Sequence, residues 1–483
     1  MINSVSSPNF NFSVQSTAAP AAAPQGETIE FSYNSQDRLV KSADTVDVSG
    51  VRREGASLST ERVKLDASLK PNAEGEYVFD QETQPKSFTA AHSFASVVNT
   101  LKMFEEAYGQ KVPWATRSEQ LTVVPDGGEM LNACYSRSEG SVNFFHSLDP
   151  VTNEMIYSGQ SGEAVSHEVG HAILDGLRPD YLMAWSPDPG GFHEHFADMT
   201  GFLMATQDDA TCEIVAKETG GDLTKDNSLS YTAEELGVAI GNSSGTDRKF
   251  IRNANNDFKW QDPSTLPHHA PPDQLGTEMH SWSQVYTGAM YDAFTKMVKR
   301  GMEEEGMTAA QAIKDCGAQF IELYAHTMKE APRGDFSYKQ MANCMLRADR
   351  EYMGGKNQTF LREGFIGRNI LPGGMSVQSH DYGAQVVRPM TVGLDGDFGM
   401  FSGAKVQTYV DAEKMYVNDS QSSEAKELRQ NMKRLIDAGR ILYTEPNQKI
   451  ETKDLFDNKG VPYAGVVRWV DGNMVIERNT IIN

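Results

Sequence analysis

SHEVGHAILDG, which spans residues 166–176, places two histidines four positions apart and a glutamate directly after the first of them. On an α-helix, side chains at positions i and i+4 lie on the same face, one turn apart. His167 and His171 can therefore bind a single metal ion, and Glu168 can reach a water molecule next to that ion. The spacing predicts a catalytic zinc site, although such a short match also arises by chance in a chain with 11 histidines.

A catalytic zinc ion usually has three protein ligands and one open position, so a third ligand must come from elsewhere in the chain. In metzincin-type proteases, a glycine and a further histidine follow the second histidine at once. Here Leu174 and Leu177 stand three and six residues after His171, which excludes that class.

A second helix, predicted within GGFHEHFADMTG at 190–201, offers the third ligand. Glu194 shares a helical face with Asp198, four residues later, and the Asp198 carboxylate can hold a ligand imidazole in place by accepting its hydrogen bond. His193 and His195 flank Glu194 but point about 100° to either side of it. We therefore prefer Glu194 as the third ligand and keep the two flanking histidines as rivals.

These residues together resemble the thermolysin family of zinc metallopeptidases, the gluzincins. The family pattern is His-Glu-x-x-His, then a glutamate with Ala/Ser-Asp three and four residues on. It is met by His167, Glu168, His171, Glu194, Ala197 and Asp198. Five separate blocks occur in the family's order, so the resemblance covers about residues 85–370.

The resemblance implies roles for residues outside the motif. In MLNACYSRSEGSVNFF, which resembles the family's edge strand, Asn132 and Ala133 would bind the substrate backbone, and Arg252 would be a further substrate-binding residue. His280 would stabilise the transition state. Each of these side chains also has a structural interpretation: a turn for Asn132, a salt bridge for Arg252 and a helix cap for His280.

Two residues near the histidine helix match the family as well. Tyr181 lies ten residues past His171, where the family has a catalytic tyrosine at a slightly different offset. Asp175, four residues past His171, matches a family aspartate and is expected to lie in the shell behind the metal ligands.

The resemblance implies an α+β fold with the two lobes of a thermolysin-like zincin. We expect a disordered segment over 1–28, a strand-rich lobe over 29–175 that ends in the histidine helix, a mainly helical lobe over 176–372 and an α+β extension over 373–483. The extension matches nothing recognisable, and we expect it either to dock a partner or to cover the cleft.

Local patterns predict several individual elements. Alternating apolar and polar residues between about 28 and 90 predict short strands. Helical spacing predicts a helix over 90–109 and another from about 162 to 175, with Gly109 and Gly176 as their C-terminal stops. The end of the chain, GVVRWVDGNMVIERNTII, predicts a hairpin about DGN.

The implied activity is that of a zinc-dependent endopeptidase, with one catalytic zinc ion and a peptide or protein as substrate. Zinc would lower the pKa of a water molecule towards neutrality, and Glu168 would act as the general base that passes the proton to the leaving amine. His280, with Tyr181, would hold the oxyanion. Calcium is not predicted, because Ala205 stands where a carboxylate ligand belongs.

Two alternatives to a general endopeptidase stay open. One is a translocated bacterial effector protease that acts on host or competitor proteins. The other is a non-catalytic, zinc-supported binding protein in which the C-terminal extension recognises the partner. A pure binding protein has no need of a base beside two metal ligands, so the presence of Glu168 favours an enzyme.

Composition limits the partners of the chain. Its 483 residues predict two or three domains. A net charge of −22 argues against nucleic acid as a partner, because phosphate binding needs a basic surface. No window approaches the length of a membrane span. Four cysteines without C-x-x-C spacing fit a reducing compartment at least as well as a disulfide framework.

The first 28 residues contain neither Lys nor Arg and no sustained apolar run, so they do not form a secretory signal. Their polar, uncharged composition predicts disorder and resembles export signals of the type III kind. We therefore expect a cytoplasmic protein or one exported without a Sec signal. About 90 residues precede the region of resemblance, enough for the strand-rich lobe but not for an inhibitory propeptide as well.

Overall fold

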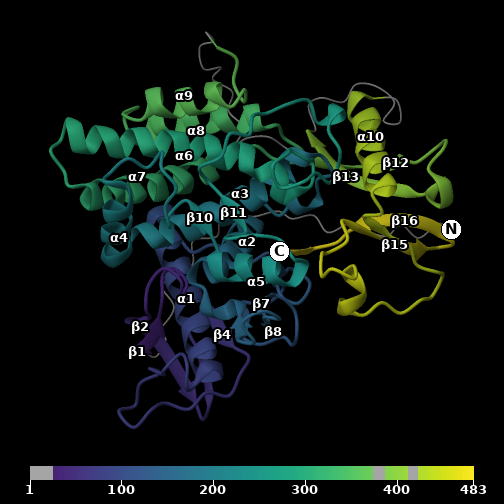
Figure 1. Cartoon of the computed structure of the whole chain (residues 1–483). Coiled ribbons are helices and arrows are strands. Elements are labelled where there is room, and N and C mark those ends of the chain that lie inside the picture. The colour runs from purple at the N-terminus through teal and green to yellow at the C-terminus, as the bar shows by residue number, and fades with distance from the viewer. Residues whose placement is uncertain (1–25, 374–386, 412–421) are drawn as a thin grey trace, which may run out of the picture.

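The computed structural model describes residues 26–373, 387–411 and 422–483, and these residues form an α+β architecture, as the sequence predicts (Figure 1). Residues 1–25, most of the segment that is predicted to be disordered, lie outside the described residues. The α-helices of the described residues are α1 (Pro85–Tyr108), α2 (Gly162–Leu177), α3 (Pro187–Thr206), α4 (Asp209–Thr219), α5 (Glu234–Ser244), α6 (Met279–Glu303), α7 (Ala309–Glu330), α8 (Tyr338–Tyr352), α9 (Gln358–Gly367) and α10 (Ser423–Asp437).

The larger sheet has eight strands in the order β1–β2–β3–β4–β5–β7–β6–β17. Neighbouring strands are antiparallel except for the pairs β4–β5 and β5–β7. The strands are β1 (Glu27–Tyr33), β2 (Asp44–Glu54), β3 (Ser57–Ser59), β4 (Val63–Leu65), β5 (Leu121–Val124), β6 (Ala133–Ser136), β7 (Ser141–Phe144) and β17 (Ile481–Ile482). The last strand of the chain therefore forms the edge of a sheet whose other strands lie within residues 27–144.

α1 packs against this sheet and connects it to the helical part of the molecule. The helix begins at Pro85, five residues before the predicted start, and Pro fits the first turn because its missing N–H has no partner there. Gly109 ends the helix with a φ of 78°, which confirms the predicted stop.

A second sheet lies in the C-terminal part of the chain, with the strand order β12–β13–β16–β15–β14. Its strands are β12 (Val387–Gly393), β13 (Lys405–Asp411), β14 (Ile441–Leu442), β15 (Gly465–Val470) and β16 (Asn473–Arg478). The predicted hairpin about DGN joins β15 to β16, and its two turn residues, Asp471 and Gly472, both have positive φ. This sheet and α10 bury a hydrophobic cluster of their own, to which Trp185 also belongs.

Two short two-stranded sheets complete the strands of the described residues. They are formed by β8 (His146–Leu148) with β9 (Met155–Tyr157) and by β10 (Tyr231–Thr232) with β11 (Arg252–Asn253).

α2 and α3 lie at the centre of the molecule, with α2 packed on α3 and α3 packed on α6. Every residue of α2 except Gly176 is buried, and every residue of α3 after its first is buried. A helix that is buried on all sides must contact other elements all round, which explains why polar residues on these helices face one another rather than water. The motif of residues 166–176 is therefore internal.

The predicted helix stop at Gly176 is wrong. α2 continues to Leu177 and is capped by Arg178. Gly176 instead allows a close contact, because a Cβ atom at this position would lie 1.8 Å from the carbonyl oxygen of Pro113. The glycine is required by packing against a distant loop and not by the end of the helix.

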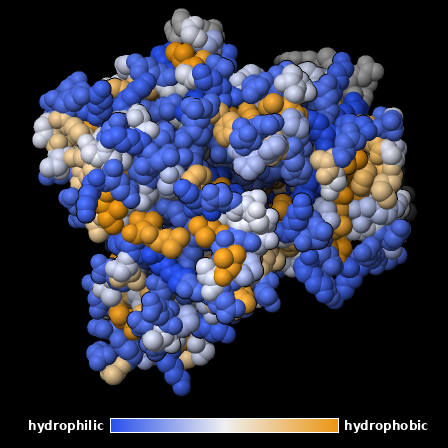
Figure 2. All heavy atoms as spheres, in the orientation of Figure 1, coloured by the Kyte–Doolittle hydropathy of each residue, from blue (hydrophilic) through white to orange (hydrophobic). Residues whose placement is uncertain are grey.

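The surface seen in Figure 2 is mostly hydrophilic, in keeping with the acidic composition. Within the described residues, no helix combines the length and the apolar character that crossing a membrane requires. All four cysteines are buried and free, so none of them forms a disulfide.

Gly176→Ala should destabilise the fold, because the added methyl group overlaps the Pro113 carbonyl. We expect the free energy of unfolding to fall by about 1–3 kcal/mol, as overpacked sites usually show. Thermal denaturation measures the effect. Gly367→Ala is the matched control, since a Cβ at that helical glycine meets no atom within 4 Å; equal stability of the two variants would contradict the packing argument.

Candidate metal centre and cleft

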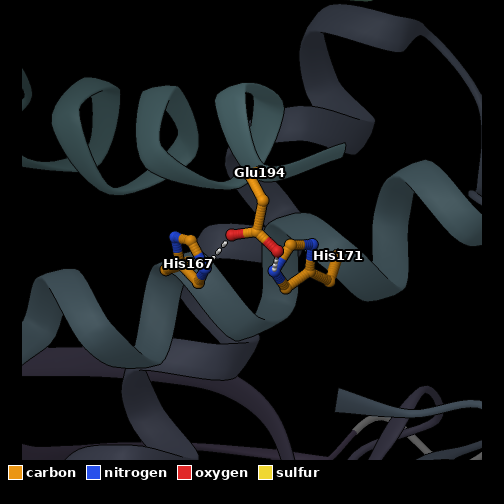
Figure 3. A group of neighbouring side chains, drawn as sticks. All are labelled: His167, His171 and Glu194. Atoms are coloured by element: carbon orange, nitrogen blue, oxygen red, sulfur yellow. Dashed lines mark ion pairs between the residues drawn. The ribbon is translucent and has the colours of Figure 1, made fainter. Parts of the chain in front are cut away.

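His167, His171 and Glu194 converge on one point between α2 and α3 (Figure 3). The two histidines project from the same face of α2, and Glu194 faces them from α3. Glu194 Oε2 lies 3.4 Å from His167 Nε2, and Glu194 Oε1 lies 3.7 Å from His171 Nε2. One atom from each residue can thus bind the same cation, since these atoms lie within 4.8 Å of one another.

The unpaired atoms of this group fit a metal ion. His171 Nε2 and both carboxylate oxygens of Glu194 are buried and make no hydrogen bond within the protein. A buried carboxylate without hydrogen bonds is costly, and a cation bound between these atoms would remove that cost. Two imidazole nitrogens and one carboxylate also leave a fourth tetrahedral position open, as catalytic metal sites require.

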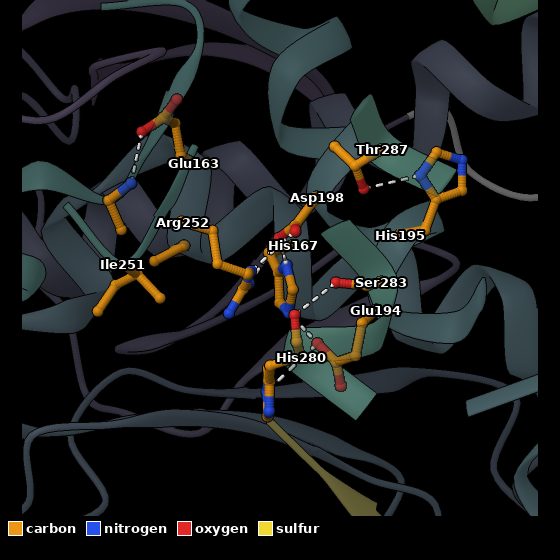
Figure 4. A network of polar contacts seen from close by, with 12 residues as sticks. Glu163, His167, Glu194, His195, Asp198, Ile251, Arg252, His280, Ser283 and Thr287 are labelled. Atoms are coloured by element: carbon orange, nitrogen blue, oxygen red, sulfur yellow. Dashed lines mark hydrogen bonds and ion pairs between the residues drawn. The ribbon is translucent and has the colours of Figure 1, made fainter. Parts of the chain in front are cut away.

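Asp198 contacts His167 at the ring nitrogen that does not face Glu194, and Arg252 contacts Asp198 in turn (Figure 4). Asp198 Oδ1 lies 2.9 Å from His167 Nδ1, which leaves Nε2 turned towards Glu194. Arg252 donates to both oxygens of Asp198, from Nε at 2.8 Å and from Nη2 at 2.5 Å. Burial alone would raise the pKa of the Asp198 carboxyl, but Arg252 and His167 outweigh it and hold that pKa well below its usual range.

The same carboxylate affects the protonation of His167. Burial lowers the pKa of this imidazole, but the contacts with Asp198 and Glu194 outweigh burial and raise the pKa to about 9. A metal ion must therefore displace a proton from His167 before it can bind there. Burial, followed by the charge of His167, lowers the pKa of His171 well below its ordinary value, so this second imidazole is neutral.

The two rival histidines on α3 take different places. His193 Nδ1 lies 2.8 Å from His171 Nδ1, so His193 can accept the hydrogen bond that fixes the tautomer of the ligand. His195 contacts Thr287 Oγ1 at 2.9 Å and the Tyr324 hydroxyl at 2.8 Å, away from the candidate metal ligands, which we call the ligand group: His167, His171 and Glu194. Among these three neighbours, only Glu194 faces both histidines of α2.

Glu168 lies next to the ligand group and lines the adjoining cleft. Burial raises the pKa of its carboxyl to about 8, and the Glu194 carboxylate adds to this rise, against the opposing charges of His167, His280 and Arg252. Its Oε2 atom has no hydrogen-bond partner. A buried carboxyl whose pKa lies near neutrality is suited to take up and release a proton.

His280 lies at the start of α6, across from the ligand group. Its Nδ1 contacts Glu278 Oε1 at 2.7 Å, and its Nε2 lies 3.3 Å from Glu194 Oε2. Burial lowers the pKa of His280, but the charges of Glu194 and Glu278 outweigh it and raise the pKa to about 9. His280 is thus a cation at neutral pH and can donate from both ring nitrogens.

A cleft of about 770 Å³ adjoins these side chains. Besides His167, Glu168 and His280, it is lined by all three residues to which the family resemblance gives substrate-binding roles: Asn132, Ala133 and Arg252. Ala133 opens β6, and Arg252 opens β11. The structure therefore brings residues from separate stretches of sequence to one cleft.

Tyr181 is not brought to this cleft. Its side chain is fully buried, its hydroxyl donates to the carbonyl oxygen of Pro332 at 2.6 Å, and its ring packs 4.5 Å from that of Phe336. Asp175 likewise accepts from Tyr135 at 2.7 Å and from both Nε and Nη2 of Arg137. It links α2 to β6 and to the residue that follows this strand.

Sequence reasoning did not assign roles to three residues of this site. Glu278 caps α6 with its side chain and contacts the His280 imidazole. The sequence signal for this role is an acidic residue at a helix N-terminus, two positions before a histidine. His193 was considered only as a rival ligand. Asn483, at the end of the sequence, contacts both His280 and Asn132, and no local pattern points to this contact.

Metal affinity should depend steeply on pH, because a proton competes with the metal at His167. Below about pH 9, we expect the affinity for zinc to fall by about tenfold for each unit that pH decreases. Asp198→Asn removes the charge that raises the pKa of His167, so fewer protons should compete with the metal in this variant. Between pH 7 and 9, the slope of log affinity for zinc against pH should therefore be smaller than that of the wild type by about one decade per pH unit. Competition with a chromophoric chelator measures both proteins, and equal slopes would contradict the assignment.

Comparisons with known proteins found no relative from which a function could be transferred to this chain. No protein-family model matches the chain, and no curated protein matches it. The arrangement of the described side chains is thus the basis for assigning a function.

Proposed function

We propose that this protein is a zinc-dependent endopeptidase with the organisation of a thermolysin-like zincin. The observation that carries the proposal is the buried group of His167, His171 and Glu194, whose ligand atoms converge beside Glu168 and an open cleft. Two imidazoles and one carboxylate with an open fourth position form a ligand set typical of catalytic zinc. A binding protein would have no use for a carboxyl group beside two metal ligands and an open cleft.

Zinc bound by these three residues would act as a Lewis acid, lowering the pKa of a water molecule and polarising the scissile carbonyl. Glu168 takes a proton from the attacking water at a carboxylate oxygen and then donates it to the nitrogen of the leaving amine. The metal's positive charge favours the ionised form of Glu168, so the carboxyl is a base before the attack.

His280 supplies positive charge where the carbonyl oxygen becomes negative. Its Nδ1–H is held by Glu278, which turns Nε2–H towards the cleft. A donor fixed in advance stabilises an oxyanion without having to reorganise during the reaction. Glu278 thus orients the ring, and His280 contacts the reacting oxygen.

β6 and the residues before it provide the surface for the peptide backbone. An extended peptide can add to a strand by main-chain hydrogen bonds, with side chains alternating between pockets; on β6, it would take the position at which β17 pairs in the structure. Asn132 and Arg252 both line the cleft. Asn132 Nδ2 donates to the carbonyl oxygen of Gly460, and Arg252 donates to Asp198, but each group has further N–H donors that could bind peptide carbonyls. Binding along a strand suits an internal peptide segment, which favours an endopeptidase.

The two-lobed organisation is supported by where the ligands come from. α2 follows all strands of the larger sheet except β17 in sequence, while α3 and α6 belong to the helical part. A cleft between a strand-rich lobe and a helical lobe, with the histidine helix at its floor, is the arrangement that the family resemblance implies.

Glu168→Gln should abolish peptide hydrolysis and leave zinc content near one ion per chain. Glutamine keeps the shape of the side chain but cannot carry the proton, so kcat should fall by about 10³-fold. Hydrolysis of a quenched fluorescent peptide and elemental analysis of the same sample measure the two effects. A variant that keeps its zinc and still cleaves at the wild-type rate would show that Glu168 is not the base.

Glu194→Ala should lose zinc, because it removes one of three ligands. His195→Ala is the matched control from the neighbouring position on α3, and it should keep its zinc, since His195 bonds to Thr287 and Tyr324 instead. Equilibrium dialysis followed by metal analysis compares the two. The third ligand is misassigned if the control variant loses zinc and Glu194→Ala retains it.

A further inference from the structure

The last residues of the chain lie in the proposed peptide-binding cleft. After β16, the chain leaves the five-stranded sheet and β17 pairs antiparallel with β6, with Ile481 opposite Ser136 and Ile482 opposite Tyr135. In Figure 1, the letter C accordingly marks an end of the chain that lies away from the five-stranded sheet that precedes it. We call residues 479–483 the C-terminal segment; it adds a strand to the edge that a substrate would use.

The end of the C-terminal segment contacts two residues that are assigned to the substrate. The carbonyl oxygen of Asn483 accepts a hydrogen bond from His280 Nε2, the nitrogen that would hold the oxyanion. The side-chain Nδ2 of Asn483 donates to Asn132 Oδ1 at 3.1 Å. Asn483 also lines the same cleft as Glu168. The first of these contacts is the one expected of the scissile carbonyl of a bound peptide, and the second joins two side chains at the same end of β6.

The direction of β17 identifies the half of the cleft that is filled. β17 runs towards the ligand group, so the residues before Asn483 lie along β6 and the Asn483 carbonyl reaches His280. A substrate whose scissile carbonyl reached His280 would place its preceding residues on the same backbone positions. The C-terminal segment therefore fills the half on the amino-terminal side of the scissile bond, and the cleft of about 770 Å³ remains beyond it.

The segment is held by apolar burial and by an anchor at its start. Ile481 and Ile482 are only 5% and 2% exposed, and Ile482 belongs to the main hydrophobic core. Just before the segment, Arg478 donates from Nε to the carbonyl oxygen of Leu182 at 3.1 Å and stacks 4.8 Å from the ring of Trp185. A ligand tethered in this way has a high effective concentration at its site and competes strongly with free peptides.

We propose that the C-terminal segment is an internal ligand of the cleft, so that a peptide binds along β6 only after this segment has left it. The effect on cleavage rests on the proposed peptidase function, whereas the competition for β6 rests on the geometry alone. The segment also indicates the class of ligand that this half of the cleft takes. It is an extended peptide with two branched aliphatic residues before the residue whose carbonyl meets His280.

Ile482→Asp is expected to release the segment in the full chain, because a carboxylate at this buried position has no partner. The kcat/KM for a quenched fluorescent peptide should rise by about tenfold or more, as expected when a tethered competitor leaves. Val470→Asp is the matched control: it places the same charge on the five-stranded sheet at a position that is 49% exposed, and it should behave as the wild type. Folded, zinc-loaded Ile482→Asp that cleaves no faster than the wild type would overturn the proposal.

Peptide binding separates this inference from the proposed function. A labelled peptide of residues 477–483 should bind Ile482→Asp about tenfold or more tighter than the wild type, as measured by fluorescence anisotropy. This comparison needs no catalysis. If neither protein cleaves any peptide but the difference in affinity is found, the proposed function fails and the internal ligand stands. Equal affinity for the two proteins overturns the internal ligand, whether or not they cleave.

A reversible cross-link tests the same point without introducing a charge into the core. Ser136 and Ile481 are directly opposite on antiparallel strands, and Cα atoms of such pairs lie about 4.5–5.5 Å apart, within the range of a disulfide. In Ser136→Cys/Ile481→Cys, oxidation should reduce both cleavage and peptide binding by about tenfold or more, and reduction with a phosphine should restore both. Each single variant is the control for the redox treatment. Equal behaviour of the oxidised and reduced forms, with the cross-link verified by mass spectrometry, would overturn the proposal even if Ile482→Asp does not fold.

Discussion

The close packing of α2 on α3 is the constraint on which the site depends. Gly170 lies between the two histidines of the motif, and a Cβ atom there would be 2.8 Å from the Cα atom of Ala197. Only a glycine lets the backbones approach this closely, and the approach places Glu194 opposite His167 and His171. A wider separation would leave three isolated polar groups in the core, each of them costly to bury. The ligand group and the helix packing therefore depend on each other.

Opposite charges then fix the side chains around this group. Arg252 neutralises Asp198, Asp198 contacts His167, and Glu278 contacts His280. Paired charges are tolerated in the interior because each offsets the desolvation penalty of the other. The ionised partners also keep the imidazole nitrogens at defined positions, which a reaction at a metal requires. The electrostatics thus serve orientation as much as stability.

The C-terminal part of the chain reaches the site through β17, which pairs with the larger sheet and not with the five-stranded sheet that precedes it. Its five-stranded sheet and α10 have a separate hydrophobic cluster, and the chain then returns to the larger sheet through β17. Of the two roles expected for this extension, docking a partner or covering the cleft, the contacts of Asn483 with His280 and Asn132 favour the second. Backbone pairing gives such a segment affinity, and the two isoleucines give it a fixed register.

Local sequence is enough to predict the parts of the site that result from the geometry of a single helix. Spacings of four residues place His167 with His171 and Glu194 with Asp198, because the period of an α-helix converts sequence distance into direction. The end of α1 at Gly109 and the hairpin between β15 and β16 also follow from local helix periodicity and turn chemistry. These features need no knowledge of what lies across from them.

Contacts between distant segments are specified only by the tertiary structure. It placed His193 against His171, buried the Tyr181 hydroxyl against Pro332, and gave Gly176 a role in packing rather than in ending a helix. It also brought Asn483 to the cleft. Local periodicity cannot specify such pairings, because each depends on how elements far apart in the chain pack into one core. The free energy of that core depends on all of these elements at once.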